Sequence, residues 1–141
     1  MKKSLCIILV LFVMWILFIR PSRTYQFPNP PEDIISIDLL INENEMGNVD
    51  TSKLVFQRRL SAEEAASFMD EIYGLETRRC YPPTWGWGEY IAKVTYSNGD
   101  VELLGSDNIE YVKKGGQATG CGPYSFWVYG VFEEVFSRYM K

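Results

Sequence analysis

The chain has 141 residues, a formal net charge of −4 and no histidine, and 47% of its residues are hydrophobic. That length suits a single domain, and the hydrophobic content suffices for a packed core. Without histidine, a Ser-His-Asp triad, a Cys-His pair and histidine-ligated zinc are excluded. From Thr24 onward there are 18 acidic and 10 basic residues, a balance of −8, which disfavours nucleic acid as a partner.

The first feature along the chain is an uncharged apolar run at residues 4–19, between Lys3 and Arg20. As a helix it is about 24 Å long, and the flanking basic side chains can reach the interface of a bilayer core of roughly 30 Å. We expect an uncleaved transmembrane helix within residues 1–20. A cleaved signal peptide and a buried helix of a soluble fold are the alternatives. Neither fits well, because no small-residue cleavage site follows and the run is apolar on all sides.

The basic residues around this run favour a cytoplasmic N-terminus with the rest of the chain outside the cell membrane. Two lysines and the α-amine precede the run, against two arginines after it. Residues 21–31 contain four prolines and predict an extended linker that holds the domain away from the bilayer. Tyr25 and Phe27 of this linker are expected near the lipid headgroups. The folded domain is then expected over residues 32–141.

Residues 34–41 and 53–60 predict the first two strands of that domain. The apolar residues expected to share one face of the first strand are Ile35, Ile37, Leu39 and Ile41. Ser61 and Glu64 have the spacing of a capping box, which opens a helix, and Gly74 is the expected left-handed residue at its end. The buried stripe of this helix is predicted to comprise Ala65, Phe68, Met69 and Ile72.

A β-meander is predicted for the next part of the chain. Residues 89–96 alternate in polarity, and the expected core-facing side chains are Tyr90, Ala92, Val94 and Tyr96. Asn98-Gly99 follows, a pair that tolerates the positive φ angles of a type I′ hairpin turn. Residues 101–104 and 109–112 are the expected returning strands.

The C-terminal part closes the predicted fold. Residues 124–129 fit either a last strand or the start of a helix. The apolar positions of an amphipathic closing helix are Val131, Phe132, Val135, Phe136 and Tyr139. Together these elements predict an α+β fold: an antiparallel sheet of about five strands with one or two helices packed on one face, preceded by a single N-terminal transmembrane helix.

This order of elements resembles small membrane-anchored or lipoprotein-type domains of unknown function from Gram-positive bacteria. The resemblance covers roughly residues 32–140: a strand such as 34–41, a capped helix, a meander with a turn such as 97–100, and a short closing helix. The resemblance implies an extracytoplasmic location and no particular activity. The lipid-accepting cysteine that often follows the apolar run in such proteins is missing, since Cys6 stands near the beginning of the run.

Cys80 and Cys121 are the two cysteines outside the apolar run. In a domain exposed to an oxidising compartment, two thiols in loop-like contexts favour a disulfide. Closing a loop of about 40 residues contributes roughly 4 kcal/mol in the chain-entropy model. Two free thiols are the alternative, but no histidine is available to activate either of them.

Trp85 and Trp87 stand on either side of a single glycine, with Tyr90 close behind. In an extended chain both indoles point to one side, where they can stack on a sugar, a peptide proline or an aromatic ligand. These three aromatic residues are the candidate binding residues. The alternative is that the rings cover the core or meet a membrane interface.

No stretch of the sequence has the pattern of a catalytic, metal or cofactor site. Residues 42–53 resemble a calcium loop only in part, because Lys53 stands where the bidentate glutamate is required. The glycines of residues 115–122 lack the Lys-Ser/Thr ending of a P-loop. The paired carboxylates at 63–64, 70–71 and 133–134 fall on polar helix faces.

We therefore expect a membrane-anchored, extracytoplasmic, non-enzymatic binding module whose partner is a protein or a cell-envelope polymer. Two alternatives remain open. One is an immunity or inhibitor protein that neutralises a basic toxin or hydrolase through the acidic surface. The other is a small hydrolase that uses carboxylates alone, which requires two carboxylates to converge in a concave pocket.

Overall fold

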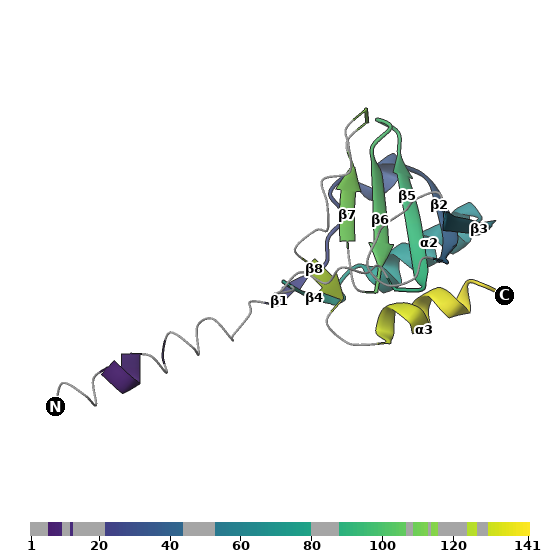
Figure 1. Ribbon diagram of the computed structural model, residues 1–141. Coiled ribbons are helices and arrows are strands. Elements are labelled where there is room, and N and C mark those ends of the chain that lie inside the picture. Colours follow the sequence, from purple (N-terminus) through teal and green to yellow (C-terminus); the bar gives the residue numbers. More distant parts are fainter. Residues whose placement is uncertain are drawn as a thin grey trace.

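The structure, a computed structural model, describes residues 6–9, 12, 22–43, 53–79, 88–106, 109–112, 114–115, 124–126 and 130–141. The main sheet is antiparallel, with five strands in the order β3-β2-β5-β6-β7, and a smaller antiparallel sheet has the order β1-β4-β8 (Figure 1). The strands are β1 (Ser22–Thr24), β2 (Ile34–Asn42), β3 (Leu54–Arg59), β4 (Glu76–Arg79), β5 (Tyr90–Tyr96), β6 (Val101–Gly105), β7 (Ile109–Val112) and β8 (Tyr124–Phe126). The helices are the 3-10 turn η1 (Pro31–Asp33), α2 (Ala62–Ile72) and α3 (Val131–Arg138). The predicted α+β class and five-stranded antiparallel sheet are confirmed.

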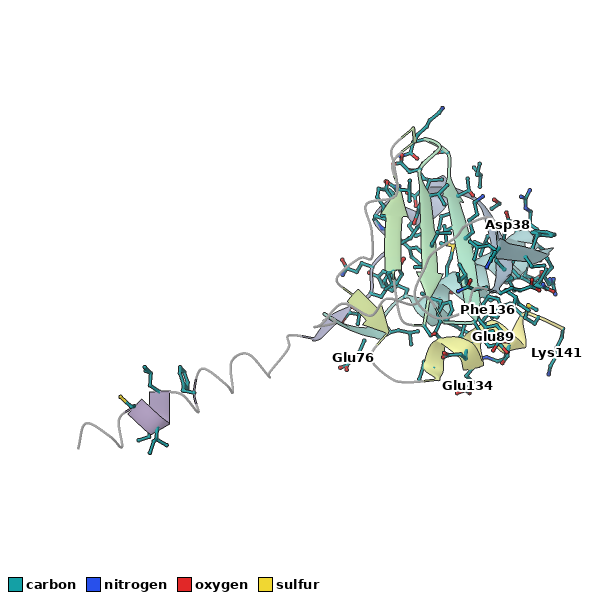
Figure 2. The ribbon with its side chains drawn as sticks, viewed as in Figure 1. Asp38, Glu76, Glu89, Glu134, Phe136 and Lys141 are labelled. Atoms are coloured by element: carbon teal, nitrogen blue, oxygen red, sulfur yellow. The ribbon has the colours of Figure 1, made fainter. Side chains whose placement is uncertain are left out.

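Helices α2 and α3 contribute to one core with the main sheet. From the sheet, the side chains with no exposed surface in this core are Ile37, Leu39, Ala92, Val94, Tyr96 and Leu104. From the helices, they are Phe68, Ile72, Phe132 and Phe136. Figure 2 shows how α3 divides its faces, with Phe136 toward the sheet and Glu134 away from it. The predicted stripes of both helices are therefore the ones that are buried.

Helix α2 begins as the sequence predicts. The Ser61 hydroxyl accepts a hydrogen bond from the Glu64 amide at 3.2 Å, and the Glu64 carboxylate accepts one from the Ser61 amide at 2.8 Å. This reciprocal pair satisfies two of the amides that a helix start leaves without a partner. Gly74 has φ +97°, the left-handed conformation expected just after the helix.

Strand β2 departs from the simple alternation expected for it. Ile37 and Leu39 face the helices, but Ile35 is 67% exposed. The pairing with β5 is irregular between Ile34, opposite Tyr96, and Ser36, opposite Thr95, so β2 carries an extra residue there. This bulge lets both Ile34 and Ile37 pack on the core and turns Ile35 outward. The predicted core position of Ile35 is therefore wrong.

The β5–β6 hairpin forms where expected, but its turn differs. Thr95 pairs with Val101, the Gly99 amide donates to the Tyr96 carbonyl at 2.9 Å, and Gly99 has φ +85°. Among the described residues only glycines have a positive φ, so Asn98 does not adopt the type I′ conformation. The hairpin has a three-residue loop that ends on a left-handed glycine, the next commonest solution.

The segment from Ser22 onward belongs to the folded domain. Strand β1 pairs with β4, and the Tyr25 amide donates to the Leu75 carbonyl at 2.8 Å. Tyr25 is 5% exposed inside the core, and Phe27 packs against that core. The expected position of these two rings near lipid headgroups is therefore wrong, because both bury their apolar surface in the domain.

Only part of the N-terminal apolar run is described. Residues 6–9 and 12 are helical. Among the helices in the described part of the chain, none is long and apolar enough to cross a bilayer. The predicted transmembrane helix therefore stays a prediction.

Candidate functional site

The structure describes one of the candidate site residues. Tyr90 is half-buried at the start of β5, and its ring stacks on Phe136 with centroids 5.0 Å apart and an interplanar angle of 30°. One face of this ring therefore belongs to the core. Trp85, Trp87 and the proposed Cys80–Cys121 pair lie outside the described residues, as does most of the loop compared with a calcium site.

A buried carboxyl group not singled out in the sequence lies on β6. Glu102 is 2% exposed and shares the core-facing side of the strand with Leu104. The Tyr96 hydroxyl donates a hydrogen bond to Glu102 Oε2 at 2.8 Å. No cationic side chain among the described residues forms an ion pair with this carboxylate.

The surroundings of Glu102 raise its pKa to about 7. Burial is the main cause, because a carboxylate in an apolar environment loses its hydration. The hydrogen bond from the Tyr96 hydroxyl and the nearby Tyr25 hydroxyl favour the ionised form and limit the rise of the pKa. Burial and the nearby carboxylate in turn raise the pKa of Tyr25 and Tyr96, so both phenols stay protonated. Glu102 therefore changes its charge near neutral pH.

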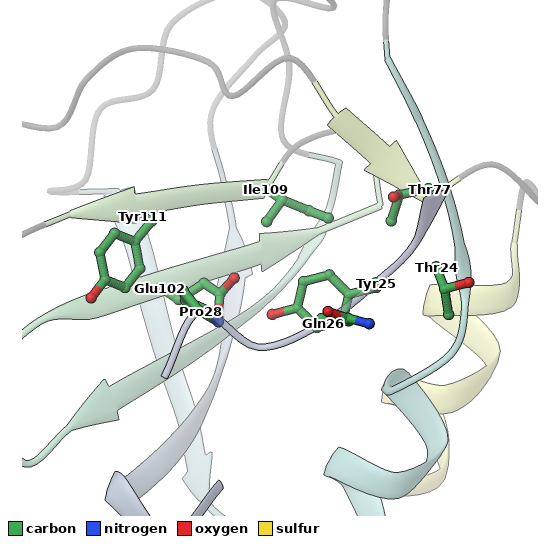
Figure 3. A pocket seen from close by; sticks show the side chains of 8 residues that line it. All are labelled: Thr24, Tyr25, Gln26, Pro28, Thr77, Glu102, Ile109 and Tyr111. Carbon is green, nitrogen blue, oxygen red and sulfur yellow. The ribbon is translucent and has the colours of Figure 1, made fainter. Parts of the chain in front are cut away.

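Glu102 is one of the residues that line an open pocket of about 320 Å³ (Figure 3). The described residues that line this pocket are Thr24, Tyr25, Gln26, Pro28, Thr77, Glu102, Ile109 and Tyr111. The Tyr25 hydroxyl points toward Glu102 (Figure 3). At the other end, the Tyr111 hydroxyl donates to Asp100 Oδ2 and accepts from Asn29 Nδ2, the latter at 2.9 Å.

The residues of this pocket suit a structural role better than a catalytic one. Glu102 is the single acid among its described lining residues, whereas a two-carboxylate hydrolase needs a second one in the same cleft. No group of three or more metal-ligating side chains occurs in the described part of the chain. What Glu102 does hold is Tyr96 of β5, by the hydrogen bond at 2.8 Å, and the Tyr25 hydroxyl points toward the same carboxylate.

A second depression lies between the start of β2 and helix α2. Its volume is also about 320 Å³, and its lining is Pro31, Ile34, Ile35, Ser36, Ile37, Leu60, Ala62, Ala65, Ala66 and Met69. Nine of these ten residues are apolar. We call this depression the β2–α2 groove. Ile35, exposed by the bulge, stands at its side, and Ala66 is exposed on the helix.

No family model, no curated protein and no solved structure matches this chain.

Sequence reasoning missed both depressions, for different reasons. Glu102 had a signal in the sequence. It stands between Val101 and Leu103 and shares one face of the strand with Leu104, so it is a charged residue in an otherwise apolar strand. The β2–α2 groove had no such signal. It depends on the bulge at Ile35, and nothing in the run Ile34-Ile35-Ser36-Ile37 distinguishes a bulged strand from a regular one.

Proposed function

We propose that this chain is a non-enzymatic binding module held at the outer face of a membrane by an N-terminal transmembrane helix. The observation that carries the binding role is the β2–α2 groove, an apolar depression on the surface that includes Ile35 at 67% exposure. Apolar surface left open to water is costly unless something covers it part of the time. The partner is a protein or a polymer of the cell envelope.

The proposed anchor rests on the uncharged run at 4–19 and on where the domain starts. Strand β1 begins at Ser22, so only Arg20 and Pro21 separate the run from the folded domain. Such a short connection keeps the domain within a few ångströms of the bilayer, because two residues span about 7 Å when extended. The groove is then accessible to proteins and polymers that lie close to the membrane surface.

An immunity or inhibitor role is the second candidate, and the charge of the domain supports it. The balance of −8 from Thr24 onward attracts basic proteins over long range and raises their association rate. This candidate differs from the first only in what the binding does to the partner. The carboxylate-only hydrolase lacks comparable support, because Glu102 is the one acid among the described residues that line its pocket.

Two experiments on cells that express the full chain test the membrane location and the binding separately: fractionation tests the location, and crosslinking tests the binding. We expect the protein to stay in the membrane through alkaline carbonate washing, and external protease to digest the domain in intact cells. A soluble mature form starting near Thr24 contradicts the anchor. Crosslinking on intact membranes, followed by pull-down, should recover a partner of defined stoichiometry. If the chain is recovered alone at every crosslinker length, the binding role is wrong.

A further inference from the structure

The first half of β2 has an open edge. Strand β3 pairs with residues 38–42 of β2, and the last link on that side is the Leu60 amide donating to the Ile37 carbonyl at 3.0 Å. Residues 34–36 have pairing partners on the other side only, in β5. After Leu60 the chain turns away into α2, so no described strand runs along this stretch. An extended strand with an open edge is a template for a further strand.

The β2–α2 groove lies beside this edge and provides apolar contacts. Ile34, Ile35 and Ile37 line it from β2, and the short side chains of Ala62, Ala65 and Ala66 line it from α2. Alanines leave space between the helix and the strand that larger side chains would fill. A strand added along β2 would direct alternate side chains into this space. Edge and groove together therefore form one site for an extended peptide.

The charges around the groove are negative. On α2, Glu63 and Asp70 stand one turn before and one turn after Ala66, and both are exposed. Glu32 and Asp33 follow Pro31 in η1 at the other end of the groove. None of these four acids takes part in an ion pair among the described residues.

The nearest arginines, on β3, do not offset these acids. Arg58 pairs with Glu64 at 2.7 Å, and Arg59 pairs with Asp38 at 2.6 Å. Both guanidinium groups are thus matched by acids other than the four at the rim. An apolar groove with an unbalanced acidic rim complements a segment that alternates apolar and basic side chains.

We propose that the open edge of β2 and the β2–α2 groove bind an extended, lysine- or arginine-rich segment of a partner protein by β-strand addition. This rests on the proposed binding function and names the site and the chemistry of the partner. Main-chain hydrogen bonds to β2 supply affinity, the groove selects apolar side chains at alternate positions, and the acids select the basic ones. A second copy of this chain is disfavoured as the occupant, because each copy brings the same acidic rim.

Titration of the full chain in a non-ionic detergent with a defined peptide tests this proposal. The probe is the peptide Lys-Val-Lys-Val-Lys-Val-Lys, and its binding is measured by calorimetry at low and at high salt. The test variant is Ala66→Arg, which places a cationic side chain in the groove, and the matched control is Ser67→Arg, one residue further on the exposed helix surface. Both changes suit a helix and add the same charge.

We expect the peptide to bind the wild-type chain more weakly as salt increases. Ala66→Arg should weaken binding at least tenfold, and Ser67→Arg less than threefold. A peptide N-methylated at every residue, which cannot donate main-chain hydrogen bonds from either edge, should bind at least tenfold more weakly than the parent. Replacing its lysines by glutamates should abolish binding.

Four outcomes overturn the proposal: no binding of the lysine peptide, equal loss in the two arginine variants, undiminished binding of the N-methylated peptide, or equal binding of the glutamate peptide. A chain that is dimeric in detergent and becomes monomeric only in Ala66→Arg overturns it too, in favour of a second copy. Failure of the proposed function looks different. In that case the peptide binds as expected, but crosslinking on intact membranes recovers no partner.

Discussion

Glu102 is a buried carboxyl group that makes the stability of the fold depend on pH. Its carboxylate accepts a hydrogen bond from Tyr96 of the main sheet at a position that is 2% exposed, and the Tyr25 hydroxyl points toward it. Burial disfavours the charged form more than hydrogen bonding favours it, so the folded state is more stable when the group is protonated. The stability of the folded domain is therefore sensitive to pH in the neutral range.

Replacing Glu102 by glutamine tests this sensitivity. The folded state raises the pKa of Glu102 from 4.5 to about 7, so between these pH values the folded state binds more protons than the unfolded state. Stability therefore falls as the pH rises through this window. We expect Glu102→Gln to increase the free energy of unfolding at pH 8 by up to about 3 kcal/mol, and to have a much smaller effect at pH 4.

Urea unfolding at the two pH values measures this difference. Glu63→Gln is the control, because it removes the same charge from an exposed position on α2. A Glu102→Gln variant that is less stable than the wild type at pH 8 and at pH 4 alike would contradict a buried, costly carboxylate. It would assign the group a net stabilising role instead.

Among the elements, α2 has the clearest local cause. Ser61→Ala removes the hydroxyl that accepts from the Glu64 amide, and we expect a loss of about 1 kcal/mol in unfolding free energy. Ser67→Ala, on the exposed side of the same helix, should be neutral or slightly stabilising, since alanine is the better helix former. Denaturant unfolding of both variants measures the contrast. Equal effects would mean that the cap contributes nothing beyond helix propensity.

The β5–β6 turn depends on one backbone conformation. Gly99 has φ +85°, a region that L-residues with a Cβ rarely adopt, and a Cβ there would lie 2.7 Å from Lys114 Cδ. The lysine side chain can move, so the backbone sets the cost, and we expect Gly99→Ala to lose about 1–2 kcal/mol. Gly99→Asn should lose less, because asparagine tolerates the left-handed region. Thermal unfolding that ranks the two variants in the opposite order would contradict this account.

These elements also show what the sequence could and could not reveal. The cap of α2, the hairpin at 97–100 and the stripes of both helices follow from local rules, and the structure confirms their positions. Strands β1 and β4 were missed, because each is short and exists through pairing with residues more than fifty positions away. The bulge in β2 was missed for a similar reason: β5 and the core decide it, not the residues of β2 alone.

For the molecule as a whole, the position of β1 changes the expected relation to a membrane. The proline-containing segment packs on the domain, so it does not act as a spacer. If the run at 4–19 spans a bilayer, the small sheet β1-β4-β8 starts right at its surface. An acidic domain held that close to anionic lipids is repelled by them, which favours an orientation with its acidic groove turned away from the bilayer.

The compartment of the domain also determines the state of Cys80 and Cys121, whose disulfide stays a prediction. If the domain is outside the cell, alkylation before and after reduction should differ by two thiols. Cys80→Ser should lower the melting temperature by several degrees, because opening a loop of about 40 residues costs a few kcal/mol. Two free thiols in protein exported by its native host would contradict the disulfide and weaken the outside location.

Site-specific photo-crosslinking in intact cells tests whether the β2–α2 groove binds a partner outside the membrane. A benzophenone-bearing phenylalanine would replace Ile35, which is 67% exposed beside the groove, or Tyr73, which is 55% exposed beyond the end of α2. We expect position 35, and not position 73, to crosslink to an extracytoplasmic protein, through a segment in which basic and apolar residues alternate. Equal crosslinking from the two positions, or crosslinking at position 35 to cytoplasmic proteins alone, would contradict it.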